Sequence, residues 1–186
     1  MRGEQFEGVL AGAQAGAEWA VAALYRESYP KLVRYLRAHE PVEGEDLAAD
    51  TWLDAARGLY RFEGDEGAFQ RWIFTIARRR LVDFQRRRSR SARAHRALRE
   101  LADPGDVEGA GAPVLAASET EAALARIASL PPDQAEVVLL RVVAGLEVAD
   151  VAAILDKKPG TVRVLQHRAL QRLAEELTRE GWTVTR

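Results

Sequence analysis

The stretch that decides the fold reads VADVAAILDKKPGTVRVLQHRALQRLAEEL and covers residues 148–177. Apolar residues recur at helical spacing over residues 148–155, and again over residues 162–177. Between the two runs, the residues DKKPG predict a tight turn followed at once by a new helix. A short helix, a tight turn and a longer basic helix together form the pattern of a helix-turn-helix.

The second helix of this motif carries side chains suited to reading DNA. In a helix-turn-helix, the N-terminal part of the second helix faces base edges, where Arg suits guanine, Gln suits adenine and Thr suits thymine. The predicted base contacts are Thr161, Arg163, Gln166 and His167. The predicted phosphate contacts, which position the protein without reading sequence, are Lys157, Lys158, Arg168 and Arg172. The alternative is an ordinary helical hairpin with a charged outer face.

Charge is segregated along the chain, although the formal net charge is only −1. Residues 40–66 hold nine acids and two bases, and residues 67–99 hold eleven arginines and one acid. Residues 100–121 hold six acids and no base, whereas residues 157–172 hold five bases and no acid. Two basic segments separated by an acidic one indicate two anion-binding surfaces on two bodies, although an arginine run can also be a solvated helix face.

The whole sequence predicts an all-α chain of two small helical domains, because strand-like alternation is scarce. Residues 103–118 lack periodicity and are rich in Gly, Pro and acids, which predicts a flexible acidic linker. The predicted division is a first domain over residues 1–92, a linker over 93–118 and a helix-turn-helix domain over 119–186. In the first domain, helices are predicted over residues 19–29, from Pro30 to a loop at 39–44, over 45–60 and over 68–88.

Composition excludes several classes of function. The chain has no cysteine, which excludes a disulfide scaffold, a thiol nucleophile and a cysteine-bearing zinc site. Its three histidines, His39, His95 and His167, are too dispersed to predict a metal site. Neither a long apolar run nor a signal-peptide pattern occurs, so we expect a cytoplasmic protein without a membrane partner. No acid–base constellation is evident, so we expect no catalytic residue, no metal, no cofactor and no enzyme activity.

Both predicted domains resemble extracytoplasmic-function (ECF, group IV) RNA polymerase sigma factors. The second domain carries this resemblance in Gly160-Thr161-Val162-Arg163 and His167-Arg168-Ala169-Leu170. The first carries it in Glu45-Asp46-Leu47, Asp50-Thr51-Trp52 and Arg71-Trp72-Ile73. The match covers residues 18–90 and 119–177, and the order and spacing of the motifs make it specific.

The resemblance implies a protein that binds core RNA polymerase and directs it to promoters. Its helix-turn-helix would bind the −35 element. The polymerase surface, docking on a coiled coil of the largest catalytic subunit, would be an acidic stripe of Asp46, Asp50 and Asp54. The surface that melts the −10 element would combine a loop with the basic helix after it, namely Glu63, Gly64, Asp65, Arg71, Arg78, Arg79, Arg80, Arg86 and Arg87. Family members are commonly held inactive by an anti-sigma factor, so such a partner is expected.

The sequence also departs from the family pattern. Arg79 stands where many members carry Asn, and Lys158 stands where most carry a Ser or Thr cap. Val164 and Leu165 replace small polar and basic residues, which leaves fewer side chains to read bases. The preferred −10 and −35 sequences are therefore not carried over from the family.

Three alternatives stay open from sequence alone. The chain could be a free-standing helix-turn-helix regulator that acts without polymerase. The acidic linker could enter the RNA exit path of the polymerase or serve as a plain tether. Phe69, Trp72 and Phe84 could stack on unpaired bases, but their place on an apolar helical stripe favours the core.

Overall fold

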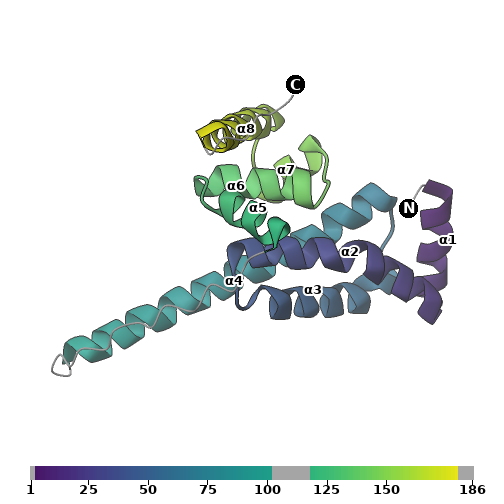
Figure 1. Cartoon of the computed structure of the whole chain (residues 1–186). Helices are drawn as coiled ribbons and strands as arrows, with labels where there is room; N and C mark the ends of the chain where they lie inside the picture. The colour runs from purple at the N-terminus through teal and green to yellow at the C-terminus, as the bar shows by residue number, and fades with distance from the viewer. Residues whose placement is uncertain (1–2, 102–117, 180–186) are drawn as a thin grey trace.

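The computed structural model describes residues 3–101 and 118–179, and every regular element in these ranges is a helix, which confirms the predicted all-α class (Figure 1). The first range holds α1 (Gly3–Gln14), α2 (Glu18–His39), α3 (Gly44–Gly58), a 3-10 turn η1 (Leu59–Arg61) and α4 (Glu66–Leu101). The second holds α5 (Glu119–Ala128), α6 (Pro132–Val138), a π-helical segment η2 (Leu139–Val143), α7 (Val148–Leu155) and α8 (Pro159–Arg179).

Helix α2 is the centre of the first domain and packs against α1, α3 and α4. Leu24, Leu32 and Leu36 recur on one face of α2 and are fully buried. Phe69 and Ile73 of α4 join the same cluster. Burial of each such side chain contributes about 1.5–3 kcal/mol, so this face holds the four helices together.

Pro30 lies inside α2, where the sequence predicts the start of a new helix. A proline cannot donate its backbone hydrogen bond, so the helical ladder is weakened at this turn. Lys31 pairs with Glu27 across the turn at 2.8 Å, and Arg34 Nε donates to the Pro30 carbonyl oxygen at 3.1 Å. Burial of leucines on both sides of Pro30 keeps the two halves in one continuous helix.

Helix α1 is an element that the sequence analysis does not predict. Three glycines, Gly3, Gly8 and Gly12, make it a weak helix by propensity. Its Phe6 is nevertheless buried, with its ring centroid 5.7 Å from that of Phe69. Tertiary packing therefore stabilises a helix that local preference does not favour.

Helix α4 is longer than predicted. It spans 36 residues and continues to Leu101, past the expected helix end at Arg88 and the expected domain boundary at residue 92. Residues 93–101, expected in the flexible linker, are therefore helical, because Ala, Arg and Leu in this stretch are strong helix formers. The rest of the expected linker, residues 102–117, lies outside the described residues, and the domain division stays a prediction.

The second domain forms the two helices of the predicted helix-turn-helix, α7 and α8, and one of its other helices is irregular. Ser118 and Glu121 form a reciprocal capping box at the start of α5. Asp156 ends α7 in the left-handed conformation, with a φ of 52°, and so makes the tight turn before α8. The helix that begins at Pro132 finishes in the π-helical segment η2, where Val142 is exposed. A π turn shifts side chains away from the ordinary helical phase.

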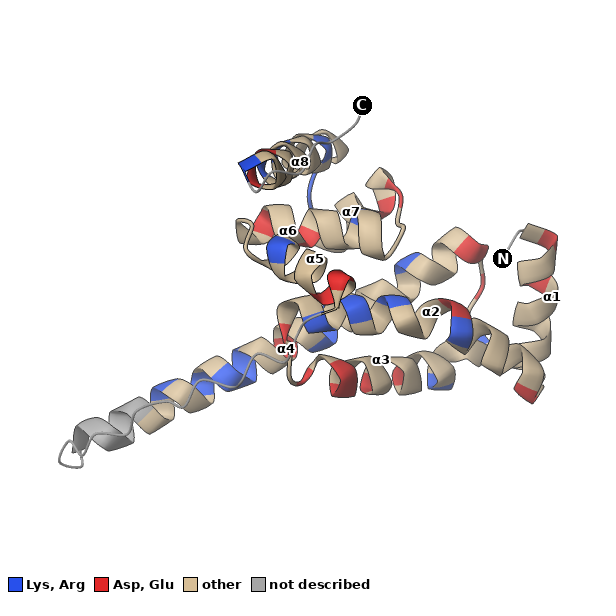
Figure 2. Cartoon of the chain, in the orientation of Figure 1, with Lys and Arg blue, Asp and Glu red and all other residues tan. Residues whose placement is uncertain are grey.

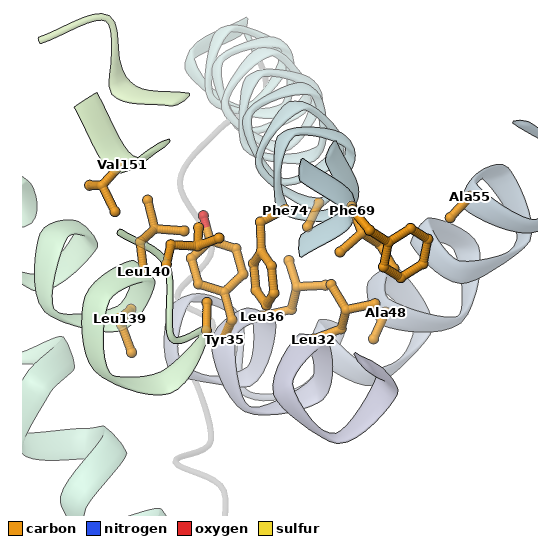
Figure 3. Packing of buried hydrophobic residues seen from close by; sticks show 14 of the residues in the cluster. Leu32, Tyr35, Leu36, Ala48, Ala55, Phe69, Phe74, Leu139, Leu140 and Val151 are labelled. Carbon is orange, nitrogen blue, oxygen red and sulfur yellow. The ribbon is translucent and has the colours of Figure 1, made fainter. Parts of the chain in front are cut away.

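The two domains share one hydrophobic core (Figure 3). Tyr35 of α2 and Phe74 of α4 are fully buried, and their ring centroids lie 5.5 Å apart. Leu139 and Leu140 of η2 and Val151 of α7 complete the same cluster from the second domain. The second domain therefore packs on α2 and α4 through α5, η2 and α7, while α8 lies beyond α6 and α7 (Figure 1).

Candidate nucleic-acid and polymerase interfaces

Helix α8 presents the predicted −35 residues on an open surface. Val162 and Ala169 are buried on its inner side, within the clusters formed with α6 and α7, which fixes the opposite side toward solvent. Six of the eight predicted residues are exposed, and Figure 2 shows the basic positions along this helix. They are Lys158, Thr161, Arg163, His167, Arg168 and Arg172.

The other two predicted −35 residues have partners within the second domain. Gln166 is half-buried, and its Oε1 accepts from Arg141 Nε at 3.3 Å. Arg141 also donates to the Leu146 carbonyl oxygen, so Gln166 links α8 to the turn before α7. Lys157 Nζ lies 3.0 Å from Asp133 Oδ2. These contacts favour a positioning role for Gln166 and Arg141, a residue that the sequence analysis does not single out.

Helix α4 presents a second basic surface, visible as the blue positions along its length in Figure 2. Its outward arginines within the predicted −10 set are Arg71, Arg79, Arg86 and Arg87. Arg78 and Arg80 are half-buried instead, because they turn toward carboxylates. Phe69 is buried, and Trp72 and Phe84 are half-buried against the core, so the structure favours the core interpretation of these rings.

The aspartate stripe of α3 already has a cationic partner. Arg80 of α4 lies between two of its members, with Nη1 2.9 Å from Asp50 Oδ2 and Nε 2.8 Å from Asp54 Oδ2. Asp46 is exposed one turn earlier. The structure thus brings a predicted −10 residue onto the predicted polymerase surface, and Arg80 offsets the like-charge repulsion along the stripe.

The loop before α4 is held in an unusual backbone conformation. Gly64 has a φ of +146°, and a Cβ there would lie 2.8 Å from the Cβ of Ala68. Asp65 Oδ1 accepts from the Ala68 backbone N–H at 2.7 Å, which caps the start of α4. Glu63, Gly64 and Asp65 are all exposed, as a loop that contacts a nucleic acid requires.

A buried polar cluster joins the two domains, and sequence reasoning missed it. Glu136 of α6 accepts from the Tyr35 hydroxyl at 2.7 Å, and its side chain is only 15% exposed. His39 Nε2 lies 2.9 Å and Arg78 Nε 3.4 Å from the same carboxylate. Glu136 stands about 60 to 100 positions from its three partners in sequence, so no local pattern could reveal the cluster.

The cluster sets the charge states of its members. Burial by itself raises the pKa of Glu136, but His39, Tyr35 and Arg78 together hold that pKa below its ordinary value. Burial, followed by the carboxylate of Glu136, raises the pKa of Tyr35 well above its ordinary value. Glu136 is therefore ionised and Tyr35 protonated at neutral pH, which is the arrangement that the hydrogen bond needs. A second interdomain pair joins Arg71 Nη1 to Asp150 Oδ1 at 2.9 Å.

Within residues 3–101 and 118–179, no group of three or more His, Asp or Glu side chains could hold a metal ion. No helix in the described part of the chain is long and apolar enough to cross a membrane.

Comparison with known proteins supports both domains. The Sigma-70 region 2 family model matches residues 24–91, and the Sigma-70 region 4 model matches residues 120–173. The ECF RNA polymerase sigma factor SigD of Mycobacterium tuberculosis is 32% identical over 191 residues, covering 97% of this chain and 88% of SigD. The ECF sigma factor BldN of Streptomyces coelicolor is 34% identical over 170 residues, covering 89% of this chain and 63% of BldN.

Solved structures agree with the sequence relatives. The sigma factor RpoE of Bartonella quintana, solved in complex with the anti-sigma factor NepR, is 26% identical with a TM-score of 0.64. The match covers 84% of this chain and 96% of RpoE. CnrH, solved with the cytosolic domain of CnrY, has a TM-score of 0.61 at 22% identity and shares the fold, over 91% of this chain and 95% of CnrH. With the Sigma-70 regions matched in both domains and SigD matched over nearly its whole length, the chain belongs to the ECF RNA polymerase sigma factors.

Proposed function

We propose that the three surfaces described above divide the work of a sigma factor, with α8 on the −35 element, α4 and its preceding loop on the −10 element, and α3 on core polymerase. The observation that carries this assignment is the exposed basic side of α8, which follows a tight turn and faces away from the first domain. Its side chains match the geometry by which a recognition helix enters the major groove.

At the −35 element, Arg163 and Thr161 supply base contacts. Both are exposed in the first turns of α8, where a recognition helix meets base edges. Arg168 and Arg172 follow on later turns and supply phosphate contacts. Binding through such contacts releases counterions, so the affinity falls steeply as salt rises.

At the −10 element, the exposed arginines of α4 track the DNA backbone while the Glu63–Asp65 loop takes an unpaired base. Opening a base pair costs a few kcal/mol, and phosphate contacts along a helix offset that cost. The rigid loop supports this assignment, because Gly64 and the Asp65 cap hold its backbone in one conformation.

At the polymerase, the aspartate stripe forms ion pairs with basic residues on a coiled coil of the largest catalytic subunit. The stripe consists of Asp46, Asp50 and Asp54. Arg80 now covers Asp50 and Asp54, so it must be displaced or shared when the polymerase binds. An anti-sigma factor is the expected further partner, since the structural relative RpoE was solved in complex with one. Acting in the cytoplasm in this way, the chain needs no metal, no cofactor and no covalent chemistry of its own.

The experiment is run-off transcription from mapped start sites with purified core polymerase and this chain as the sole sigma factor. Transcripts that depend on both components support the proposal. A chain that binds DNA but never starts transcription with core polymerase would instead support a free-standing helix-turn-helix regulator.

A further inference from the structure

Helix α1 lies ahead of the part of the chain that the Sigma-70 region 2 model matches, which begins at residue 24. It is nevertheless part of the first domain, because its Phe6 is buried with its ring centroid 5.7 Å from that of Phe69 on α4. Helix α1 also contacts η1, so it lies at the end of the domain where the chain passes from α3 to α4 (Figure 1). This end carries the loop that is proposed to take an unpaired −10 base.

The last residue of α1, Gln14, is bonded to the backbone just ahead of that loop. Its Nε2 donates to the Leu59 carbonyl oxygen at 3.1 Å and to the Phe62 carbonyl oxygen at 2.8 Å. A glutamine amide carries two N–H donors, so one side chain can bind both oxygens. Leu59 begins η1 and Phe62 follows its last residue. Because carbonyl groups at a helix end lack partners within the helix, these bonds fix the place where the chain leaves η1.

The loop is thus held at both of its ends. At its start, the ring centroid of Phe62 lies 5.4 Å from that of Phe69, while Gln14 holds the Phe62 carbonyl. At its end, Asp65 caps α4. Between them, a Cβ added to Gly64 would lie 3.2 Å from the Phe62 ring, so the loop backbone runs close over that ring. A change in the position of Phe62 would therefore move the whole loop.

The bonds of Gln14 are not needed to attach α1 to the domain. The buried apolar residues of α1 do that, namely Phe6, Val9, Leu10 and Ala13. Gln14 itself is exposed, and the hydrogen bonds of an exposed side chain contribute little to global stability. The local effect of the two bonds is larger, because they join residues 45 and 48 positions apart and end on the loop.

Resting on the −10 function proposed above, we propose that Gln14 is a positioning residue for −10 recognition, which holds the Glu63–Asp65 loop in the conformation that takes the unpaired base. A loop that is already ordered loses less conformational freedom on binding, so its affinity for a fitting base is higher. Base discrimination requires contacting atoms at defined positions, whereas phosphate contacts by the arginines of α4 do not depend on the loop. Release of the loop should therefore weaken binding to the correct −10 element and spare binding to an unrelated one.

Three variants of the full chain test this role. Gln14→Met keeps the length of the side chain and removes both N–H donors. Gln14→Glu keeps the shape but places a carboxylate, which only accepts, against two carbonyl oxygens. Gln5→Met is the matched control, because Gln5 is exposed on the same helix. Circular dichroism and thermal unfolding should be the same for all three, since the substituted side chains are exposed.

The first measurement is binding of each holoenzyme to promoter DNA from a mapped start site, with the non-template −10 bases left unpaired. A second probe carries the same −35 element and scrambled −10 bases. If the released loop occupies its binding conformation about a tenth of the time, Gln14→Met lowers the affinity for the matched probe about ten-fold relative to Gln5→Met. Gln14→Glu lowers that affinity at least as much. The affinity for the scrambled probe should stay within about two-fold in every variant.

The second measurement is hydrogen exchange in the free chain by nuclear magnetic resonance. The Phe62 amide donates to the Leu59 carbonyl oxygen, which Gln14 also binds, and the Ala68 amide donates to Asp65. Both Gln14 variants should make the Phe62 amide exchange several-fold faster than Gln5→Met does. Amides in the middle of α3 should exchange at the same rate in all three chains, which separates release of the loop from general unfolding.

Three results would overturn the proposal. One is a matched-probe affinity in both Gln14 variants equal to that of Gln5→Met. Another is an equal loss on the matched and scrambled probes, which would give Gln14 a purely structural role. The third is an unchanged exchange rate of the Phe62 amide. All three leave the proposed function standing, whereas an unchanged holoenzyme that binds both probes equally would refute the −10 role of the loop itself and this inference with it.

Discussion

Helices α4 and α8 are both rich in arginine, yet they differ in what their cations meet. On α4, Arg71, Arg78 and Arg80 each lie against a carboxylate of another helix. On α8, within the part of the chain that the structure describes, no carboxylate pairs with Arg163, Arg168 or Arg172. The arginines of α8 can bind an anion directly, whereas the three arginines of α4 must first leave their carboxylate partners. Similar sequence composition therefore hides two different starting states for binding.

The largest expected effect concerns the aspartate stripe of α3. Replacing Asp50 and Asp54 by Lys places like charges against the basic polymerase surface, so we expect core binding to fall by about 100-fold or more. The measurement is holoenzyme formation on a sizing column. Arg80→Gln is the control, because it uncovers the same stripe and should leave core binding undiminished. Normal core binding by the double lysine variant would remove the stripe from the polymerase surface.

The second prediction concerns the recognition helix α8. Arg163→Ala removes an exposed base contact, so we expect −35 affinity to fall by about 10- to 100-fold and sequence discrimination to relax. Competition binding with matched and scrambled −35 duplexes measures both. Arg172→Ala should weaken the two duplexes equally, since a phosphate contact carries no sequence information. Unchanged discrimination in Arg163→Ala would show that α8 is read in a different register.

The loop in front of α4 offers a test of stability. Gly64→Ala forces a Cβ into the positive-φ conformation and against Ala68, so we expect a loss of about 1–3 kcal/mol in the free energy of unfolding. Thermal or urea unfolding measures it. Gly67→Ala is the matched control, because a Cβ there makes only an ordinary contact with Asp65 at 3.5 Å. Equal stability of the two variants would contradict the described loop conformation.

The engaged state of α4 also predicts a pH dependence. The pKa of Glu136 is lower in the folded chain than its ordinary value, so folding favours the ionised carboxylate. Its contribution is complete above the ordinary pKa and is lost as pH falls through the lowered one. The facing groups are Tyr35 and His39 on α2 and Arg78 on α4. The free energy of unfolding of the unchanged chain should therefore fall on acidification by more than that of Glu136→Gln, as urea unfolding at several pH values measures.

The smallest expected effect concerns single phosphate contacts on the outer face of α4. Arg86→Gln should reduce the slope of log affinity against log salt by about one, with little change in sequence preference. A salt titration of −10 DNA binding by the holoenzyme measures this slope. Arg26→Gln, at an exposed position of α2 outside the proposed DNA surfaces, should leave the slope unchanged. An unchanged slope in Arg86→Gln would place that side chain away from DNA.

Much of the molecule was predictable because its signals are local. The helix-turn-helix follows from apolar spacing and the DKKPG turn, and the structure places α7 and α8 as predicted. The interruption expected at Pro30 was wrong because leucines on both sides are buried in one core. Helix α1 was missed because its glycines weaken the local signal, while Phe6 gains its stability from a distant helix.

The functional surfaces likewise combine features that follow from local sequence with features that depend on tertiary packing. Arg163 and Thr161 are exposed because they lie on the polar side of an amphipathic helix. The apolar spacing that defines this side can be read directly from the sequence. The partner of Arg80 was not predictable, because Asp50 and Asp54 stand on another helix and many arginines nearby have the same local surroundings. Which arginines are engaged and which are free depends on the helix that packs opposite each of them.

The sequence by itself determined the helical class, the helix-turn-helix and the family, since apolar periodicity, turn residues and charge blocks are short-range properties of the chain. Only the tertiary structure decided that the two domains share a core and that Glu136 reaches Tyr35, His39 and Arg78. The physical reason is that an ion pair depends on distance in space, and residues on separate helices come together only when the whole apolar surface is buried.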